Sequence, residues 1–83
     1  MKVSVKYFAS IREALGQSKE SVDTEALTLA ALRDELIGKG GAYAESLSRG
    51  RSVRLALNQT MSDESAALVE GAEVAFFPPV TGG

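Results

Sequence analysis

The fold is decided by one helical stretch, Thr28-Leu29-Ala30-Ala31-Leu32-Arg33-Asp34-Glu35-Leu36-Ile37. Its large apolar residues recur at the spacing of a helix that buries one face; they are Leu29, Leu32, Leu36 and Ile37. Thr28 is a favourable residue at a helix N-terminus, and the nearby glycines predict that the helix ends near Gly38. We expect the polar residues Arg33, Asp34 and Lys39 to lie on its other side.

Three stretches around this helix alternate between apolar and polar residues, as half-buried β-strands do. They cover residues 2–8, 53–57 and 73–77. Residues 20–22 are more weakly strand-like, and we expect them to pair with the first strand.

A short helix is expected after the first strand. Ser10 and Glu13 have the spacing of a capping box, in which each side chain bonds the backbone of the other residue. Gly16 predicts that this helix ends after Leu15.

The order of elements predicts an α+β protein with a β-grasp fold, a mixed sheet wrapped around one main helix. Residues 42–48 are interpreted as an irregular or helical link, residues 58–60 as a turn, and Asp63 and Glu64 as solvated turn residues. We expect one domain over residues 1–77 and an extended, flexible tail over residues 78–83.

Composition excludes several classes of function. The 83 residues contain neither cysteine nor histidine, which removes disulfides, thiolate chemistry and the commonest metal ligand. A net charge of −2 argues against nucleic acid, and the arginines at 49, 51 and 54 are interpreted as a solvated loop and strand edge. No stretch approaches the roughly 20 apolar residues of a membrane helix, and the N-terminus has no signal-peptide pattern. We therefore expect a cytoplasmic protein.

The end of the sequence suggests where its chemistry lies. Pro78 and Pro79 stop the last strand and favour an extended chain, so residues 78–83 can reach roughly 20 Å at about 3.3–3.6 Å per residue. Gly82 and Gly83 have no side chains that would block a narrow channel. The ionised terminal carboxylate is unreactive, but adenylation by a partner enzyme would make it an acyl donor. A persulfide could then convert it to a thiocarboxylate.

The chain resembles the ubiquitin-like sulfur carriers, and specifically the small subunits of molybdopterin synthase (the MoaD family). The resemblance spans the whole length of the chain. Its terminal part is highly specific, and the two earlier parts support it. The residues that carry it are Tyr7-Phe8-Ala9, Ile11-Arg12-Glu13, Asn58-Gln59-Thr60 and Gly71-Ala72-Glu73-Val74-Ala75-Phe76-Phe77-Pro78-Pro79-Val80-Thr81-Gly82-Gly83.

The resemblance implies a concrete role. A ubiquitin-activating-like adenylyltransferase uses ATP to adenylate Gly83, which is then thiocarboxylated. The tail, formed by Pro78, Pro79, Val80, Thr81 and Gly82, inserts into the large subunit of molybdopterin synthase. There the carrier donates sulfur to cyclic pyranopterin monophosphate for the dithiolene of molybdopterin. The large subunit holds the active site, two large and two small subunits assemble, and the carrier itself binds no metal or cofactor.

A docking surface is also expected beside the tail. Phe77 should point away from the main helix as an exposed aromatic, the kind of residue that anchors interfaces. Met61 could pack beside it as an adaptable contact. Phe8 and Arg12 are expected to extend this patch.

Other functions remain open from the sequence alone. A sulfur carrier for the thiazole of thiamine or for tRNA thiolation would have the same build and the same Gly-Gly end. A ubiquitin-like protein modifier would use the same activation step, and a plain interaction domain would leave the tail inert. An independent enzyme is disfavoured, because the sequence offers no nucleophile–base pair and no cofactor motif.

Overall fold

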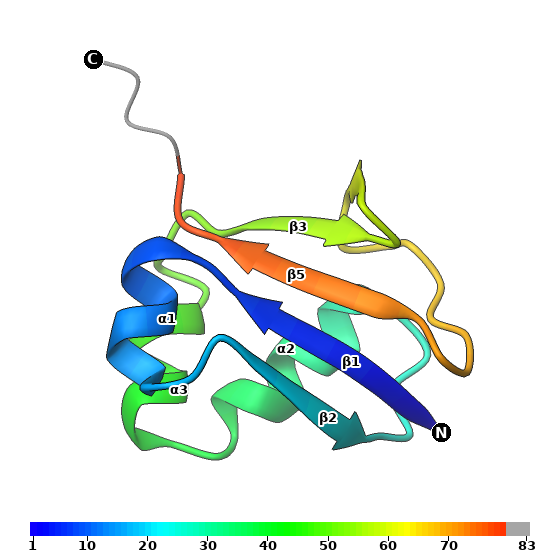
Figure 1. Cartoon of the computed structure of the whole chain (residues 1–83), viewed down its shortest axis with the longest axis horizontal. Helices are drawn as coiled ribbons and strands as arrows, with labels where there is room; N and C mark the ends of the chain where they lie inside the picture. The colour runs from blue at the N-terminus through cyan, green and yellow to red at the C-terminus, as the bar shows by residue number, and fades with distance from the viewer. Residues whose placement is uncertain (80–83) are drawn as a thin grey trace.

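The computed structural model describes residues 1–79 of the chain. Five strands form one sheet in the order β2-β1-β5-β3-β4, and three helices gather on one of its faces (Figure 1). This arrangement confirms the predicted α+β, β-grasp fold. The elements are β1 (Lys2–Tyr7), α1 (Ala9–Leu15), β2 (Lys19–Asp23), α2 (Leu29–Ile37), α3 (Gly41–Leu47), β3 (Arg54–Leu57), β4 (Thr60–Ser62) and β5 (Glu73–Phe77).

The centre of the sheet is a parallel pair made by the first and last strands. β1 and β5 run side by side with Val5 opposite Val74 and Tyr7 opposite Phe76. The other pairings, β1 with β2, β3 with β5 and β3 with β4, are antiparallel. The sheet is therefore mixed, and β5 has a strand on each side.

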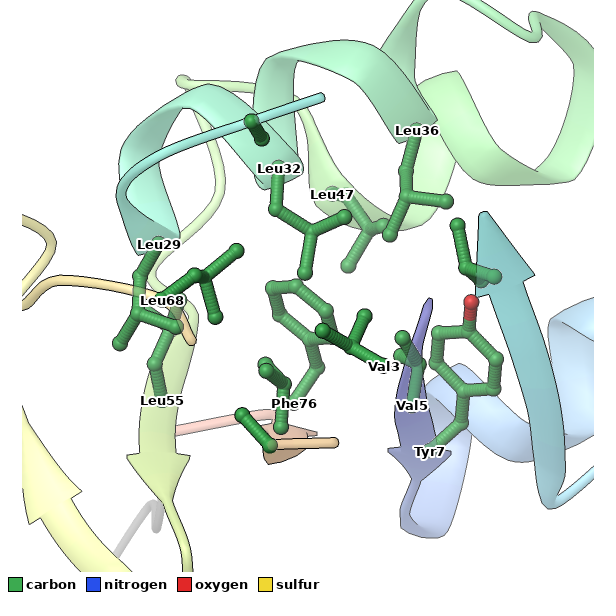
Figure 2. Close-up of a cluster of buried hydrophobic side chains, with 14 of the residues drawn as sticks. Val3, Val5, Tyr7, Leu29, Leu32, Leu36, Leu47, Leu55, Leu68 and Phe76 are labelled. Atoms are coloured by element: carbon green, nitrogen blue, oxygen red, sulfur yellow. The ribbon is translucent and has the colours of Figure 1, made fainter. Parts of the chain in front are cut away.

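The core lies between the sheet and the helices (Figure 2). Leu29, Leu32 and Leu36 of α2 point into the core that also holds Phe76 of β5, and all four side chains are at most 1% exposed. Thr28 caps α2 as the sequence predicts, since its hydroxyl accepts a hydrogen bond from the Ala31 N–H at 3.1 Å. The link before β3 is the helix α3, whose Leu47 joins the same core.

The start of α1 differs from the capping box expected at Ser10. The N-cap residue is Phe8, which has extended backbone angles and no side-chain cap. Its carbonyl accepts the N–H of Ile11 at 3.1 Å, while its own N–H donates to Phe76 of β5 at 3.2 Å. The chain thus passes from β1 into α1 without a loop, because the sheet holds Phe8 in place and Ser10 falls inside the helix.

A short strand, β4, begins at Thr60, the last residue of the predicted turn, where no strand was expected. Asn58 and Gln59 both have positive φ, 49° and 69°, which is the backbone of a tight two-residue hairpin. This turn places Met61 opposite Ala56 of β3. Three residues are too few to give a readable alternation, so the pairing with β3 determines this strand.

Arg33 is buried, contrary to the expectation that it faces solvent. Only 3% of it is exposed, and its guanidinium donates to the backbone carbonyls of Leu47 at 2.7 Å, Ser48 at 2.8 Å and Arg51 at 3.1 Å. It also contacts Glu64 at 3.4 Å. Burial lowers the pKa of this guanidinium. Arg33 therefore ties the segment that leads into β3 to the main helix.

Replacing this buried guanidinium should destabilise the domain strongly. Arg33→Met keeps much of the side-chain volume but leaves three carbonyls without their donor, so we expect a loss of about 2–4 kcal/mol in the free energy of unfolding. Urea denaturation followed by circular dichroism measures it. Arg12→Met, at an exposed position on α1, is the matched control and should cost less than about 0.5 kcal/mol. Equal losses in the two variants would contradict the structural role of Arg33.

Candidate functional site

The root of the tail lies at the end of β5, between two grooves. β5 ends at Phe77, and the half-buried Pro78 and exposed Pro79 follow, so the strand stops at the prolines as predicted. Both prolines line both grooves. Four residues predicted to form the rest of the tail lie outside the described residues; they are Val80, Thr81, Gly82 and Gly83.

One groove opens on the face of the sheet that the helices leave uncovered, and we call it the docking groove. It has a volume of about 550 Å³. Its walls bring together the start of α1, residues of β3, β4 and β5, and the start of the tail. The residues that line it are Phe8, Ala9, Arg54, Met61, Phe77, Pro78 and Pro79.

Two stacked aromatic rings form one wall of this groove. Phe8 and Phe77 stack with their ring centres 4.6 Å apart and their planes 13° from parallel. Phe77 is half-buried by this contact and is therefore less exposed than its sequence position suggested, whereas Phe8 is 37% exposed. Stacking of this kind contributes roughly 0.5–1.5 kcal/mol beyond simple burial. The pair is thus a rigid apolar surface beside the tail.

The strand register places Met61 on the same face as Phe77. Ala75 of β5, Ala56 of β3 and Met61 of β4 form one row across neighbouring strands. Both alanines are buried, while Met61 is 56% exposed. A flexible thioether therefore projects next to two small side chains, where it can adapt to an incoming group.

Three of the four predicted docking residues meet in this groove, and the fourth does not. Phe8, Met61 and Phe77 line it, but Arg12 is exposed on α1 and is not among its lining residues. Sequence reasoning missed Arg54, which was assigned to a solvated strand edge. Arg54 pairs with Phe77 across β3 and β5. Because Arg54 alternates with the buried Leu55, the sequence indicated that Arg54 lies on the outer face of the sheet. Nothing in the sequence indicated that it lies opposite Phe77.

The second groove lies on the helix side of the tail root and has a volume of about 870 Å³. Residues of α1 and α3 and the segment before β3 line it, together with the two prolines. Its lining mixes apolar groups such as Ile11 with serine hydroxyls and the charges of Glu45 and Arg51. It therefore has no single chemical character, in contrast to the apolar docking groove.

Within residues 1–79 there is no cluster of three or more acidic, histidine or cysteine side chains that could hold a metal ion. No helix in that part of the chain is long and apolar enough to cross a membrane. The buried tyrosine hydroxyl of Tyr7 donates to Glu20 at 2.6 Å, and its pKa is raised, chiefly by burial. Tyr7 belongs to the core, Glu20 is half-buried on β2, and neither residue lines either groove.

Comparisons with known proteins agree on one family. The chain is 38% identical to the molybdopterin synthase sulfur carrier subunit of Haemophilus influenzae over 98% of this chain and 99% of that protein. SAMP1 from Haloferax volcanii has the same fold, with 27% identity, a TM-score of 0.79 and complete coverage of both chains.

A further solved structure is a complex of subunits 1 and 2 of the molybdopterin-converting factor from Helicobacter pylori. It matches at 28% identity with a TM-score of 0.71 and covers both chains completely. The model of the ThiS family matches residues 5–83. These likenesses confirm the resemblance seen in the sequence, and the chain belongs to the ThiS family.

Proposed function

We propose that this protein is the sulfur carrier subunit of a molybdopterin synthase. The observation that carries the proposal is the 38% identity, over nearly the full length, to a sulfur carrier subunit of that enzyme. The placement of the tail root supports it, because Pro78 and Pro79 leave the sheet between two grooves. A partner that takes up the tail must pass over these surfaces. We expect the protein to act in the cytoplasm.

The chemistry is assigned to the carboxylate of Gly83. An activating enzyme of the ubiquitin-activating type would let this carboxylate attack the α-phosphate of ATP, releasing pyrophosphate and forming an acyl adenylate. The terminal sulfur of a persulfide then attacks the acyl carbon, and AMP leaves. A thiol cleaves the resulting S–S bond, so that a thiocarboxylate remains and a disulfide forms on the donor side. The carrier needs no catalytic side chain for these steps.

The partner in the final step is the large subunit of molybdopterin synthase. The related Helicobacter pylori protein is seen in a complex of subunits 1 and 2, which supports a partner of this kind. We propose that the large subunit rests on the docking groove and receives residues 78–83 in its active site. Sulfur then passes to cyclic pyranopterin monophosphate bound by the large subunit. Two carriers and two large subunits form the proposed assembly, and the carrier binds no cofactor of its own.

A protein-modifier role is the second candidate. Its support is the likeness to SAMP1, since a second structure of that kind is described as small archaeal modifier protein 1. Both functions use the same activated carboxylate, and they differ in what attacks it. A lysine amine would give an isopeptide bond, whereas a persulfide gives the thiocarboxylate. Immunoblots of cells would show a ladder of conjugates for a modifier and a single small species for a dedicated carrier.

The carrier step can be tested by intact mass spectrometry. We expect incubation with ATP, a persulfide source and the activating enzyme to add the mass that corresponds to replacing one oxygen by sulfur. Deletion of Gly83 should abolish this gain, because the shortened tail no longer brings its carboxylate to the nucleotide. A chain with one extra residue after Gly83 is the matched control for tail length, and it should also fail. Full sulfur loading of either variant would contradict the assignment of Gly83.

The docking groove is tested by placing a charge on its aromatic wall. Phe77→Asp should raise the Kd for the large subunit by about 30-fold or more, as expected for an aromatic anchor, while the domain stays folded. Isothermal titration calorimetry measures the Kd, and circular dichroism checks the fold. Leu27→Asp is the control, because Leu27 is 71% exposed and lies outside both grooves. Unchanged binding by Phe77→Asp would show that the partner docks elsewhere.

A further inference from the structure

Among the residues that the structure describes, Arg54 is the only charged side chain that lines the docking groove. The other lining residues are Phe8, Ala9, Met61, Phe77, Pro78 and Pro79, all apolar. Arg54 is exposed and stands directly across from Phe77 in the pairing of β3 with β5. A guanidinium is thus placed beside the stacked aromatic pair, at the root of the tail.

Among the described residues Arg54, like Arg51, has no carboxylate partner, whereas Lys6 and Arg49 have one. Lys6, on the same face of the sheet, pairs with Glu73 at 3.5 Å. Arg49 pairs with Asp34 at 2.9 Å and also with Glu64. Within residues 1–79, no carboxylate lies within ion-pair distance of Arg54. The groove therefore presents one positive charge that makes no ion pair within the described chain, although Asp63 and Glu64 line a neighbouring pocket with it.

We infer that Arg54 is the charged anchor of the docking groove and pairs with a carboxylate on the large subunit. The inference rests on the proposed function. A partner that fills the groove removes water from Arg54, and a desolvated charge is costly unless it is paired. The planar guanidinium suits a carboxylate, which it can hold through two parallel hydrogen bonds. The complementary surface thus carries an apolar group with an Asp or Glu beside it.

This charge supplies the selectivity that the apolar walls lack. Phe8, Met61 and Phe77 can accept many apolar groups, and the flexible Met61 widens that range. A surface with Lys or Arg at the matching position would place a like charge beside Arg54 in a water-poor contact, which strongly weakens binding. Arg54 therefore rejects partners of the wrong charge as well as attracting the correct one.

The test compares three substitutions by isothermal titration calorimetry against the large subunit from the same organism. Arg54→Met keeps the apolar stem and should raise the Kd by about 30-fold. Arg54→Glu should raise it by about 100-fold or more, because it adds repulsion. Arg54→Lys should have a smaller effect, about 5-fold, since it keeps the charge but not the two-bond geometry. Raising the salt from about 0.05 M to about 0.5 M should weaken wild-type binding more than that of Arg54→Met.

The control is Lys2→Glu, which changes the net charge by the same amount as Arg54→Glu. Lys2 lies at the end of β1 that is far from the tail root. It should alter the Kd by less than about 3-fold. If Arg54→Met and Arg54→Glu bind like the wild type while Phe77→Asp binds weakly, the charged anchor is excluded and the docking groove stands. If Phe77→Asp also binds normally, both the groove and the anchor are excluded.

A second copy of this chain is the alternative occupant of the groove. Analytical ultracentrifugation of the carrier alone should show a monomer that Arg54→Met leaves unchanged. Self-association of the wild type that Arg54→Met abolishes would assign the groove to a homodimer and overturn the inference. Circular dichroism of each variant separates a loss of binding from a loss of fold.

Discussion

The structure depends on the parallel pairing of the first and last strands at the centre of the sheet. Because β5 lies between β1 and β3, the chain can leave the sheet only at the point where β1 ends and β3 begins (Figure 1). Phe8 and Arg54 therefore flank the tail root. Successive side chains of β5 point to opposite faces of the sheet. Val74 and Phe76 are fully buried in the core, whereas Phe77 faces the docking groove. Core packing and the proposed recognition of a partner thus fall to adjacent residues.

Local patterns were sufficient to predict most of the fold. The main helix and the strands at both ends follow from the period of their apolar residues, and the structure confirms them. The same period contained a signal that was misread: Arg33 lies four residues after Leu29 and four before Ile37, within the apolar stripe. Its charge favoured a solvent-exposed position, but three backbone carbonyls of a distant segment accept hydrogen bonds from the guanidinium. Such partners are set by tertiary packing and leave no local trace.

Residues of the candidate site could be predicted where local sequence indicates that a side chain is exposed. They could not be predicted where the pairing of distant strands determines which residues are neighbours. Met61 and Phe77 were predicted as surface apolar residues next to a turn and a strand end, and both line the groove. Arg12 shares the early sequence segment with Phe8, but the sharp entry into α1 directs it away from the groove residues. Arg54 reaches the site only through the register that pairs it with Phe77. Register between distant strands cannot be read from one sequence.

The central position of β5 has a consequence for how the protein is made on the ribosome. β1 emerges early in synthesis, but its parallel neighbour is the last strand, so the nascent chain cannot complete its sheet until Phe77 has been added. Pairings between such distant segments form slowly, and the apolar faces stay open to chaperones meanwhile. A polypeptide whose translation stops before β5 lacks the strand that joins β1 to β3. A molecule with a complete sheet has therefore been translated at least as far as Phe77, the residue before the tail.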